Sequence, residues 1–476
     1  MEEELKKCSN KNIDGPYGIP GIILKKCRKV LSIPLTFLFN QMISKGEVPE
    51  EFQVSHVTPV PKVQKPTICP DYRPISGLSQ VLHTFERIML IYILQHLKKI
   101  NFLPKQQFGF RNGFSTTKQL ITYLEHIYAK VSAGETIDVI YFDFVKAFDK
   151  VPISKLIKSL KKAGIRDKLL RIITILLPNR KFLAKINSTR SNLADATSGI
   201  AQGSVMGPVY FIIFIAELSK RLDLHKFILH FLFADDLKTL YSYNIKDFDK
   251  SVLQNAINDI IEWCDENSMD LSTPKTHHIQ FGKPNDASVY KIKETQIEKT
   301  ETVRDLGIFI SNNLSFSNHI DNIVSNATKK LFSITKKVVT NNKSILIKLF
   351  NTYIRPSLEY CSPLFNIQKL KSADQLETPQ RKFTRILYRR IYGFTSNVPT
   401  YEERLKLFQM DSLSTRRNVA DVKIAHDFMI KNYKEKYISL YYLNHGKTRT
   451  GGNYNDCGKI KKVYYLITSP PEWRQN

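Results

Sequence analysis

The chain has 476 residues, of which 42% are hydrophobic and 11% aromatic, enough for two or three domains with apolar cores rather than a disordered chain. Its 71 lysines and arginines outnumber its 44 aspartates and glutamates, and the net charge of +27 points to nucleic acid as a partner before an anionic membrane. The 6 cysteines form no CxxC pair, and no apolar run nears the roughly 20 residues of a membrane-spanning helix, which argues against zinc modules, disulfide frameworks and membrane insertion.

The first hundred residues predict a helical extension followed by extended, proline-rich chain. The opening residues MEEELKKC lack the apolar segment of a signal peptide, so we expect a protein of the nucleus or cytoplasm. Leu31–Ile43 is amphipathic at helical spacing. From Val57, the run VTPVPKVQKPTICPDYRPIS disfavours helix because of its prolines and predicts strands and loops. Residues 80–100 place apolar side chains at helical spacing, which predicts a buried helix.

The first acidic motif, YFDFVKAFDKV, follows a predicted strand. Residues 137–142, IDVIYF, form a short run of β-branched and aromatic residues, which is typical of a buried strand. The run ends at Asp143, and from Lys146 the pattern becomes helical. The sequence therefore predicts Asp143 at the end of a strand.

The second acidic motif, FLFADDLKTL, predicts a β-hairpin. Residues 227–233 form another buried strand, and Leu237–Tyr241 can return antiparallel to it. Ala234, Asp235 and Asp236 then occupy the turn. Taken alone, the pair of aspartates is most simply a solvated turn, since aspartate is a common turn residue.

The two motifs together suggest a metal site. If the strands are neighbours in one sheet, Asp143, Asp235 and Asp236 converge at one edge. Two unit charges about 4 Å apart at an effective dielectric near 20 repel by roughly 4 kcal/mol. Divalent cations such as Mg²⁺ relieve that repulsion by binding carboxylate oxygens together with substrate phosphates, and paired ions of this kind serve phosphoryl transfer.

The second half of the chain predicts mainly helical, basic structure. An amphipathic helix is expected over residues 250–264, and a domain boundary near residue 310. Further helices are expected from about Ile320, over about 343–360 and over 373–392. Residues after 440 have loop composition, which is typical of a flexible tail.

The order and spacing of three motifs, YFDFVKAFDKV, SGIAQGSVMGP and FADD, resemble the palm of a reverse transcriptase. Their wording resembles that of jockey-like non-LTR (LINE-type) retrotransposons, over roughly residues 15–430. The resemblance implies an α+β right-hand polymerase fold, with fingers, a palm built on an antiparallel sheet, and a mainly helical thumb. The implied parts are an N-terminal extension and base of the fingers (1–54), fingers and palm (55–310), helical thumb and downstream region (311–440), and tail (441–476).

The resemblance assigns the catalytic carboxylates. Asp143 matches the family's first metal-binding aspartate, and Asp235 and Asp236 match the pair in its F/YADD box. The backbone carbonyl of Phe144 is implied as a further metal ligand. The expected cofactor is a pair of Mg²⁺ ions, with Mn²⁺ as a substitute.

The same resemblance implies the nucleotide pocket. Phe148 matches the aromatic steric gate that leaves no room for a ribose 2′-hydroxyl, although packing at a helix start is its simpler explanation. Asp149 is interpreted as a structural or capping residue. In AQGSVMGP, Gln202 is expected to contact the nucleotide and Gly203 to let the backbone approach closely. Ala201 departs from the family's usual proline, which loosens the loop but removes no reacting group.

Three basic residues are expected around the triphosphate. Arg73 in DYRPIS and Arg111 in QQFGFRNGFST match fingers arginines, whose planar guanidinium suits phosphate, although a lone arginine is more often part of a surface salt bridge. Lys275 in LSTPKTHHIQF is the candidate general acid for the leaving pyrophosphate. The alternative interpretation of Lys275 is an ordinary surface lysine. The adjacent histidines that follow, His277 and His278, point to opposite faces of a strand and are interpreted as non-ligands.

These features predict an RNA-directed DNA polymerase that extends a DNA primer with dNTPs on an RNA template. The segment VRDLGIFISNNLSFSNHI resembles the family's hairpin that grips the primer strand. No endonuclease, zinc knuckle or RNase H segment is recognisable, so a separate endonuclease is a candidate partner, and the oligomeric state stays open. Two alternatives are a retroelement fragment that binds RNA without synthesis and an RNA-templated RNA polymerase, the second disfavoured by Phe148.

Overall fold

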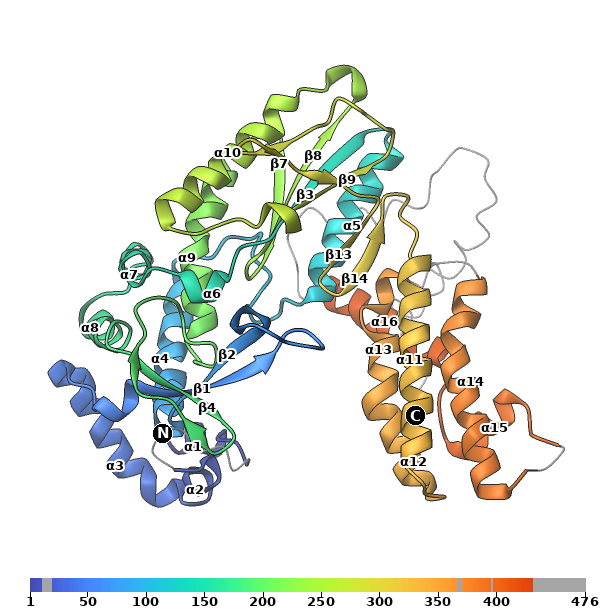
Figure 1. Ribbon diagram of the computed structural model, residues 1–476, viewed down its shortest axis with the longest axis horizontal. Helices are drawn as coiled ribbons and strands as arrows, with labels where there is room; N and C mark the ends of the chain where they lie inside the picture. Colours follow the sequence, from blue (N-terminus) through green and yellow to red (C-terminus); the bar gives the residue numbers. More distant parts are fainter. Residues whose placement is uncertain (11–18, 366–369, 395–396, 431–476) are drawn as a thin grey trace, which may run out of the picture.

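A computed structural model describes residues 1–10, 19–365, 370–394 and 397–430 of the chain. The tail expected over residues 441–476 lies outside the described residues. Figure 1 shows three regions: the N-terminal helices with a smaller sheet, the main sheet with the helices around it, and a group of long helices formed by the C-terminal part. The expected α+β class is confirmed.

The N-terminal region consists of helices and the smaller sheet. Among the described residues, the α-helices before the sheet are α1 (Glu2–Lys6), α2 (Gly21–Lys26) and α3 (Arg28–Gln41). The proline-rich run forms β1 (Val54–Pro61) and β2 (Tyr72–Gly77), which pair antiparallel, so the expected extended structure is confirmed. β1 also pairs parallel with β4 (Lys181–Ile186), which carries the short strands β5 (Thr189–Arg190) and β6 (Ala194–Asp195). The predicted buried helix is α4 (Gln80–Lys99).

The main sheet carries both acidic motifs. Its strand order is β12-β9-β3-β8-β7. The central strand β3 pairs antiparallel with β8 and β9, and β8 pairs antiparallel with β7, so both expected strands and their hairpin are confirmed. The bounds are β3 (Thr136–Phe142), β7 (Ile228–Phe233), β8 (Asp236–Tyr243), β9 (His277–Phe281) and β12 (Glu298–Lys299), with a small hairpin of β10 (Lys291–Ile292) and β11 (Thr295–Gln296) between the last two.

Each face of the main sheet packs on a different apolar core. One face lies against α9 (Gly207–Leu222) and α10 (Lys250–Asn267), and Ile140 and Leu237 point into that core. The other face lies against α5 (Thr116–Ser132), and Val139 points there. This alternation along β3 follows from the two-residue period of a strand, and it explains why residues 137–142 are apolar on both faces apart from Asp138. The short helices α6 (Ala147–Lys150), α7 (Ile153–Lys162) and α8 (Asp167–Leu176) connect the two sheets.

The C-terminal region begins with a hairpin and continues as helices. Strands β13 (Thr302–Asp305) and β14 (Ile308–Ser311) are joined through Leu306 and Gly307, both with positive φ as a tight hairpin turn requires. The expected helix is present over residues 343–359 and contains a π-helical turn: α12 ends at Leu349, and the turn at Phe350–Ile354 leads directly into α13, whose second residue is Pro356. The helices are α11 (Ser317–Lys337), α12 (Lys343–Leu349), α13 (Arg355–Glu359), α14 (Leu370–Tyr392), α15 (Tyr401–Phe408) and α16 (Leu413–Ile430).

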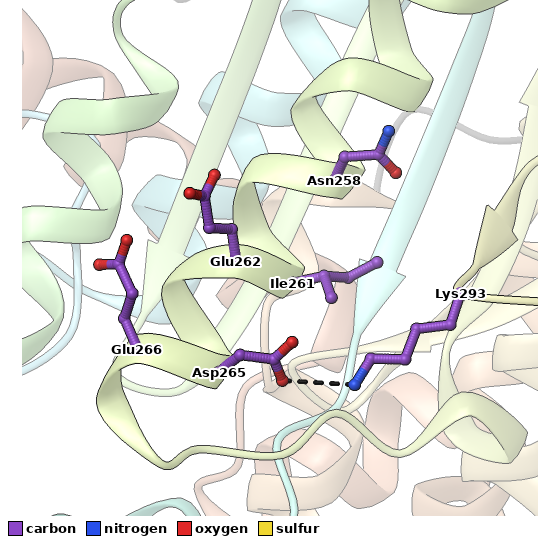
Figure 2. Close-up of a pocket in the computed structure, with 6 residues that line it drawn as sticks. All are labelled: Asn258, Ile261, Glu262, Asp265, Glu266 and Lys293. Atoms are coloured by element: carbon purple, nitrogen blue, oxygen red, sulfur yellow. Dashed lines mark hydrogen bonds and ion pairs between the residues drawn. The ribbon is translucent and has the colours of Figure 1, made fainter.

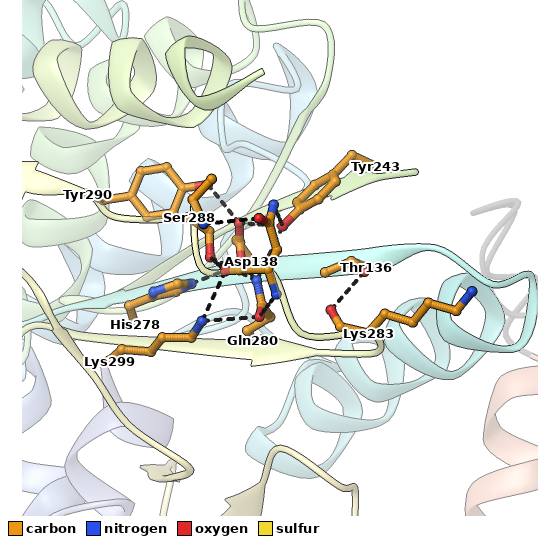
Figure 3. Close-up of polar contacts among 11 residues, drawn as sticks. Thr136, Asp138, Tyr243, His278, Gln280, Lys283, Ser288, Tyr290 and Lys299 are labelled. Carbon is orange, nitrogen blue, oxygen red and sulfur yellow. Dashed lines mark hydrogen bonds and ion pairs between the residues drawn. The ribbon is translucent and has the colours of Figure 1, made fainter. Parts of the chain in front are cut away.

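A buried polar network holds the centre of the main sheet (Figure 3). Asp138 of β3 is fully buried, and its carboxylate accepts hydrogen bonds from the Tyr290 hydroxyl at 2.7 Å and the Tyr243 hydroxyl at 3.0 Å. The same carboxylate contacts Gln280 Nε2 at 2.8 Å and His278 Nε2 at 3.0 Å. Four partners compensate for the desolvation of one carboxylate and tie β3, β8 and β9 together.

A buried ion pair connects the main sheet to the β13–β14 hairpin. Lys238 of β8 pairs with Asp305 of β13, and the two side chains are 3% and 5% exposed. The Lys238 ammonium also lies 4.2 Å from the centre of the Tyr123 ring. Burial lowers the pKa of Lys238, and the negative charge of Asp305 partly offsets this by raising it. The pair therefore fixes the hairpin against the strand that carries Asp236.

We expect Lys238→Met to destabilise the fold by about 3–5 kcal/mol, because it leaves the Asp305 carboxylate buried without its cation. The double variant Lys238→Met/Asp305→Leu should recover most of that loss, since both charges are then removed. The free energy of unfolding in urea measures both effects. The exposed pair Lys162–Glu217 is the control: Lys162→Met should change stability by less than about 1 kcal/mol. A loss no larger than in this control would contradict the interpretation.

Candidate active site

The turn between β7 and β8 presents two carboxylates. Phe233 pairs with Asp236, so Ala234 and Asp235 alone form the turn, and Asp236 is the first residue of β8 rather than part of the turn. Ala234 has φ 58°, a left-handed conformation that is unfavourable for a residue with a Cβ. This turn, Phe233–Asp236, is called the catalytic turn below.

The structure brings Asp143 to the catalytic turn. Phe142 of β3 pairs with Leu237 of β8 in antiparallel register. Asp143 comes directly after Phe142, and Asp236 comes directly before Leu237, so the two aspartates lie at the same end of neighbouring strands. Burial raises the pKa of Asp235, with a further upward contribution from the charge of Asp143. Burial and then the charge of Asp235 raise the pKa of Asp236 to about 6, and Asp143 adds to that shift. The three predicted carboxylates therefore interact electrostatically, as their spacing on the strands suggested.

The donor chemistry of this site fits a divalent cation. Neighbouring, partly desolvated carboxylates bind hard cations favourably, because the cation relieves both the repulsion and the lost hydration. Among the described residues, no group of three or more His, Cys, Asp and Glu side chains is already drawn together as a metal cluster. The groups that would hold an ion are the carboxylates of Asp143, Asp235 and Asp236 and the carbonyl of Phe144.

Phe148 lies on α6, five residues after Asp143. Its ring stacks on Phe211 of α9, with centroids 4.4 Å apart and planes 18° from parallel, and meets Phe110 edge-on at 6.4 Å. The side chain is half-buried, so one side stays accessible. The stacking holds the ring in one orientation, which a steric gate requires.

The loop before α9, residues 198–206, is called the nucleotide loop. The Gln202 side chain donates from Nε2 to Asp149 Oδ1 at 2.7 Å, and the Gln202 carbonyl accepts a 2.7 Å bond from the Ser76 backbone N–H. At Gly203, φ is 137°, and a Cβ would lie 2.3 Å from the Ser76 carbonyl oxygen. Glycine is therefore required here for close approach to β2. The partner of Asp149 is a side chain of the nucleotide loop, so its structural role is to orient Gln202.

Two further residues that sequence reasoning did not single out hold the nucleotide loop. Glu86 of α4 is buried, and its carboxylate accepts 2.7 Å and 2.8 Å bonds from the Ser204 hydroxyl and the Val205 N–H. Arg180 donates to the carbonyls of Ser198 and Gly199, at 3.3 Å and 2.6 Å. Burial raises the pKa of Glu86 to about 7, although its hydrogen bonds with Ser204 and Val205 act to lower that pKa. The only sequence signal for Glu86 was a charged residue on an otherwise apolar helix face.

The raised pKa of Glu86 makes stability depend on pH. Between its ordinary pKa of 4.5 and about 7 the folded protein holds a proton that the unfolded chain releases. The resulting stabilisation is complete below pH about 4.5 and is lost as the pH rises through about 7. As the pH rises from about 4.5 to about 7, we expect the free energy of unfolding of wild type to fall by about 3 kcal/mol relative to that of Glu86→Gln. Urea unfolding at several pH values tests this, with Glu217→Gln as the exposed control; parallel pH profiles for wild type and Glu86→Gln would exclude the effect.

The three basic residues predicted around the triphosphate have different surroundings. Lys275 lies at the site, with Nζ 3.7 Å from Asp143 Oδ2. Arg73 is exposed on β2. Arg111 instead braces a loop: its Nη1 donates to the carbonyls of Pro104 and Gln107 at 2.6 Å and 3.0 Å. Its guanidinium also lies 4.2 Å from the centre of the Phe114 ring.

A separate hollow lies on α10 and contains none of the predicted site residues (Figure 2). Its cavity volume is about 380 Å³, and Lys293 reaches Asp265 across it at 3.3 Å. Its acidic lining would repel a nucleic acid. The lining residues are Asn258, Ile261, Glu262, Asp265, Glu266 and Lys293.

None of the helices in the described ranges is both long and apolar enough to cross a membrane.

Comparison with known proteins identifies the family. Residues 60–310 match the reverse transcriptase (RNA-dependent DNA polymerase) family. The chain is 23% identical over 397 residues to the probable RNA-directed DNA polymerase from transposon X-element of Drosophila melanogaster, covering 81% of this chain and 43% of that protein. It is 24% identical over 398 residues to the RNA-directed DNA polymerase from mobile element jockey of Drosophila funebris, covering 80% and 43%. The chain thus spans about two fifths of the length of these relatives.

Solved structures of telomerase are also similar. The apo enzyme from Candida tropicalis matches with a TM-score of 0.41 and 13% identity over 60% of this chain and 59% of that one. The enzyme from Candida albicans, in complex with a telomeric RNA fragment, matches with a TM-score of 0.42 and 11% identity over 79% and 70%. The predicted resemblance to jockey-like elements is confirmed by the Drosophila relatives. Because the family match covers more than half of the 476 residues, the chain belongs to the reverse transcriptase (RNA-dependent DNA polymerase) family.

Proposed function

We propose that this chain is an RNA-directed DNA polymerase of a jockey-like non-LTR retrotransposon, which adds dNTPs to a DNA primer on an RNA template in the nucleus or cytoplasm. The observation that carries the proposal is the meeting of Asp143 with Asp235 and Asp236 at adjoining strand ends, inside the segment that matches the family. Phe148 and the Asp149–Gln202 contact lie on the segments that follow Asp143 and precede α9.

Each residue of the site has a role in this reaction. Two Mg²⁺ ions, or Mn²⁺ in their place, would activate the primer 3′-hydroxyl and neutralise the charge on the leaving pyrophosphate when held by the three carboxylates and the Phe144 carbonyl. Lys275, next to Asp143, donates a proton to the pyrophosphate. Exposed Arg73 contacts the triphosphate.

The nucleotide itself is placed by the aromatic ring and the nucleotide loop. Phe148, fixed by its stacking on Phe211, lies under the sugar and excludes a 2′-hydroxyl. Gln202 and Gly203 form the wall of the pocket. Arg111 either contacts the triphosphate or supports the shape of the site through its hydrogen bonds to the 104–107 segment. Exposed lysines on α11, including Lys329, Lys330, Lys336 and Lys337, supply charge for the template–primer backbone.

We expect Asp235→Asn/Asp236→Asn to abolish dNTP incorporation on poly(rA)/oligo(dT) with Mg²⁺ or Mn²⁺. The amides cannot supply the anionic oxygens that hold the ions, while the loss of two negative charges leaves nucleic-acid binding intact. Primer extension and a filter-binding assay measure the two properties. Asp247→Asn, at an exposed aspartate on the segment after β8, should retain full extension. Full activity of the double variant would refute the assignment, and a wild-type chain that binds but never extends would favour the binding-only alternative.

We expect Phe148→Ala to admit ribonucleotides, because loss of the ring opens the space under the sugar. The ratio of kcat/KM for rNTP over dNTP should rise by about 10-fold or more. Phe227→Ala is the control, since Phe227 is 63% exposed in the connection between α9 and β7 and its loss should leave the ratio unchanged. Equal use of rNTPs by the unmutated chain would contradict the steric gate and favour an RNA polymerase.

A further inference from the structure

The segment before α5 lies along the edge of the main sheet at the catalytic turn. β7 is the last strand of that sheet, and Gln107 forms a parallel bridge with Leu232 on its free edge. The Leu232 N–H donates to the Gln106 carbonyl at 2.9 Å, and the Phe108 N–H donates to the Leu232 carbonyl at 2.8 Å. Residues 106–108 therefore act as a short additional strand that protects the exposed edge.

The Gln107 side chain continues this contact onto the catalytic turn itself. It is 1% exposed. Its Oε1 accepts hydrogen bonds from the Ala234 N–H at 3.0 Å and the Gly109 N–H at 2.8 Å, and its Nε2 donates to the Ala234 carbonyl at 3.3 Å. One amide thus binds both backbone polar groups of the residue that immediately precedes Asp235.

Only an amide of this length provides these contacts. The position needs one oxygen that accepts two hydrogen bonds and one nitrogen that donates, which glutamine combines. An apolar side chain of the same shape would leave the N–H groups of Ala234 and Gly109 buried without partners. Asparagine, one methylene shorter, would not reach Ala234.

The surrounding loop is built to bring Gln107 this close. A Cβ at Gly109 would lie 2.4 Å from the Ala234 backbone nitrogen, so only glycine permits the approach. Arg111 binds the carbonyls of Pro104 and Gln107 and so holds both ends of the segment. The run from Gln106 to Arg111 is therefore held close to Ala234 by its backbone hydrogen bonds to β7, by the Gln107 side chain and by the absence of a Cβ at Gly109.

The catalytic turn needs such support, because its own interactions oppose its conformation. Ala234 is held at φ 58°, and the adjacent carboxylates of Asp235 and Asp236 are repelled by each other and by Asp143. We propose that Gln107 is a positioning residue, whose amide fixes Ala234 so that the carboxylates of Asp235 and Asp236 stay directed toward Asp143. Its catalytic consequence rests on the proposed function, whereas its consequence for cation binding does not.

The test compares Gln107→Met, which keeps the shape and removes the hydrogen bonds, with Gln107→Asn, which keeps the amide and loses the reach. The control is Gln106→Met, the same change at the neighbouring position, where the side-chain amide bonds to Asp223 at 2.7 Å and not to the turn. Mn²⁺ binding to the free chain, followed by electron paramagnetic resonance, gives the first readout. Single-nucleotide incorporation gives kcat and the KM for dNTP, and the urea midpoint reports folding.

Both Gln107 variants should bind Mn²⁺ about 10-fold more weakly or worse and lose kcat by about 10–100-fold, with KM for dNTP within about 2-fold, while Gln106→Met stays at the wild-type values. High Mn²⁺ should restore part of the lost kcat. Wild-type Mn²⁺ affinity and kcat in either folded variant would overturn the proposal.

Two outcomes separate this proposal from the proposed function. If the wild-type chain never incorporates dNTP but both variants lose Mn²⁺ affinity, the polymerase assignment fails and the role of Gln107 stands. If Gln107→Met does not fold, the smaller change Gln107→Asn decides. Should both variants be unfolded while Gln106→Met is not, the amide is a stabilising residue of the fold and the specific positioning role is refuted.

Discussion

Repulsion among three carboxylates at one edge of the main sheet is the constraint on which the rest of the structure depends. Asp143 directly follows the central strand, Asp235 lies in the adjoining turn and Asp236 begins β8, and burial raises the pKa of both Asp235 and Asp236. Like charges in a partly desolvated site favour protonation or separation unless the backbone is held in place. The same unfavourable energy becomes affinity when a divalent cation binds, so rigid support of the strands is what makes the site useful.

That support comes from polar groups buried on different sides of the sheet. Asp138, five residues before Asp143 on β3, is held by four partners from the neighbouring strands and loops. Lys238, two residues after Asp236, is held by Asp305 from the following hairpin. Unpaired, each of these charges would destabilise the core by several kcal/mol, whereas paired they fix the register of β3 and β8 relative to their neighbours.

The nucleotide loop is held in a comparable way, by contacts from four parts of the chain. β2 contributes Ser76, α4 contributes Glu86, the segment after Asp143 contributes Asp149, and the segment before β4 contributes Arg180. The smaller sheet and α4 thereby reach the same site as the main sheet. The loop carries an alanine at position 201, where the family resemblance implied proline, and these contacts restrict the loop without it.

The sequence by itself determined several of the elements and the residues predicted to form the site. β3, β7, β8, α4 and α10 follow from local apolar patterns, and motif order and spacing identify Asp143, Asp235, Asp236 and Phe148, because both kinds of signal lie within a few consecutive residues. The π-helical turn between α12 and α13 was not predicted, since the apolar spacing of residues 343–360 does not distinguish such a turn from a regular α-helix.

Only the tertiary structure decided which polar residues support the site. Gln107 and Ala234 are 127 residues apart, Glu86 and Ser204 are 118 apart, and Lys238 and Asp305 are 67 apart. Nothing in a local pattern distinguishes a glutamine that binds a turn from one that faces water, or a lysine with a buried partner from a surface lysine. Their roles arise when folding removes water from both partners at once, because each buried polar group must then find its hydrogen bond within the protein.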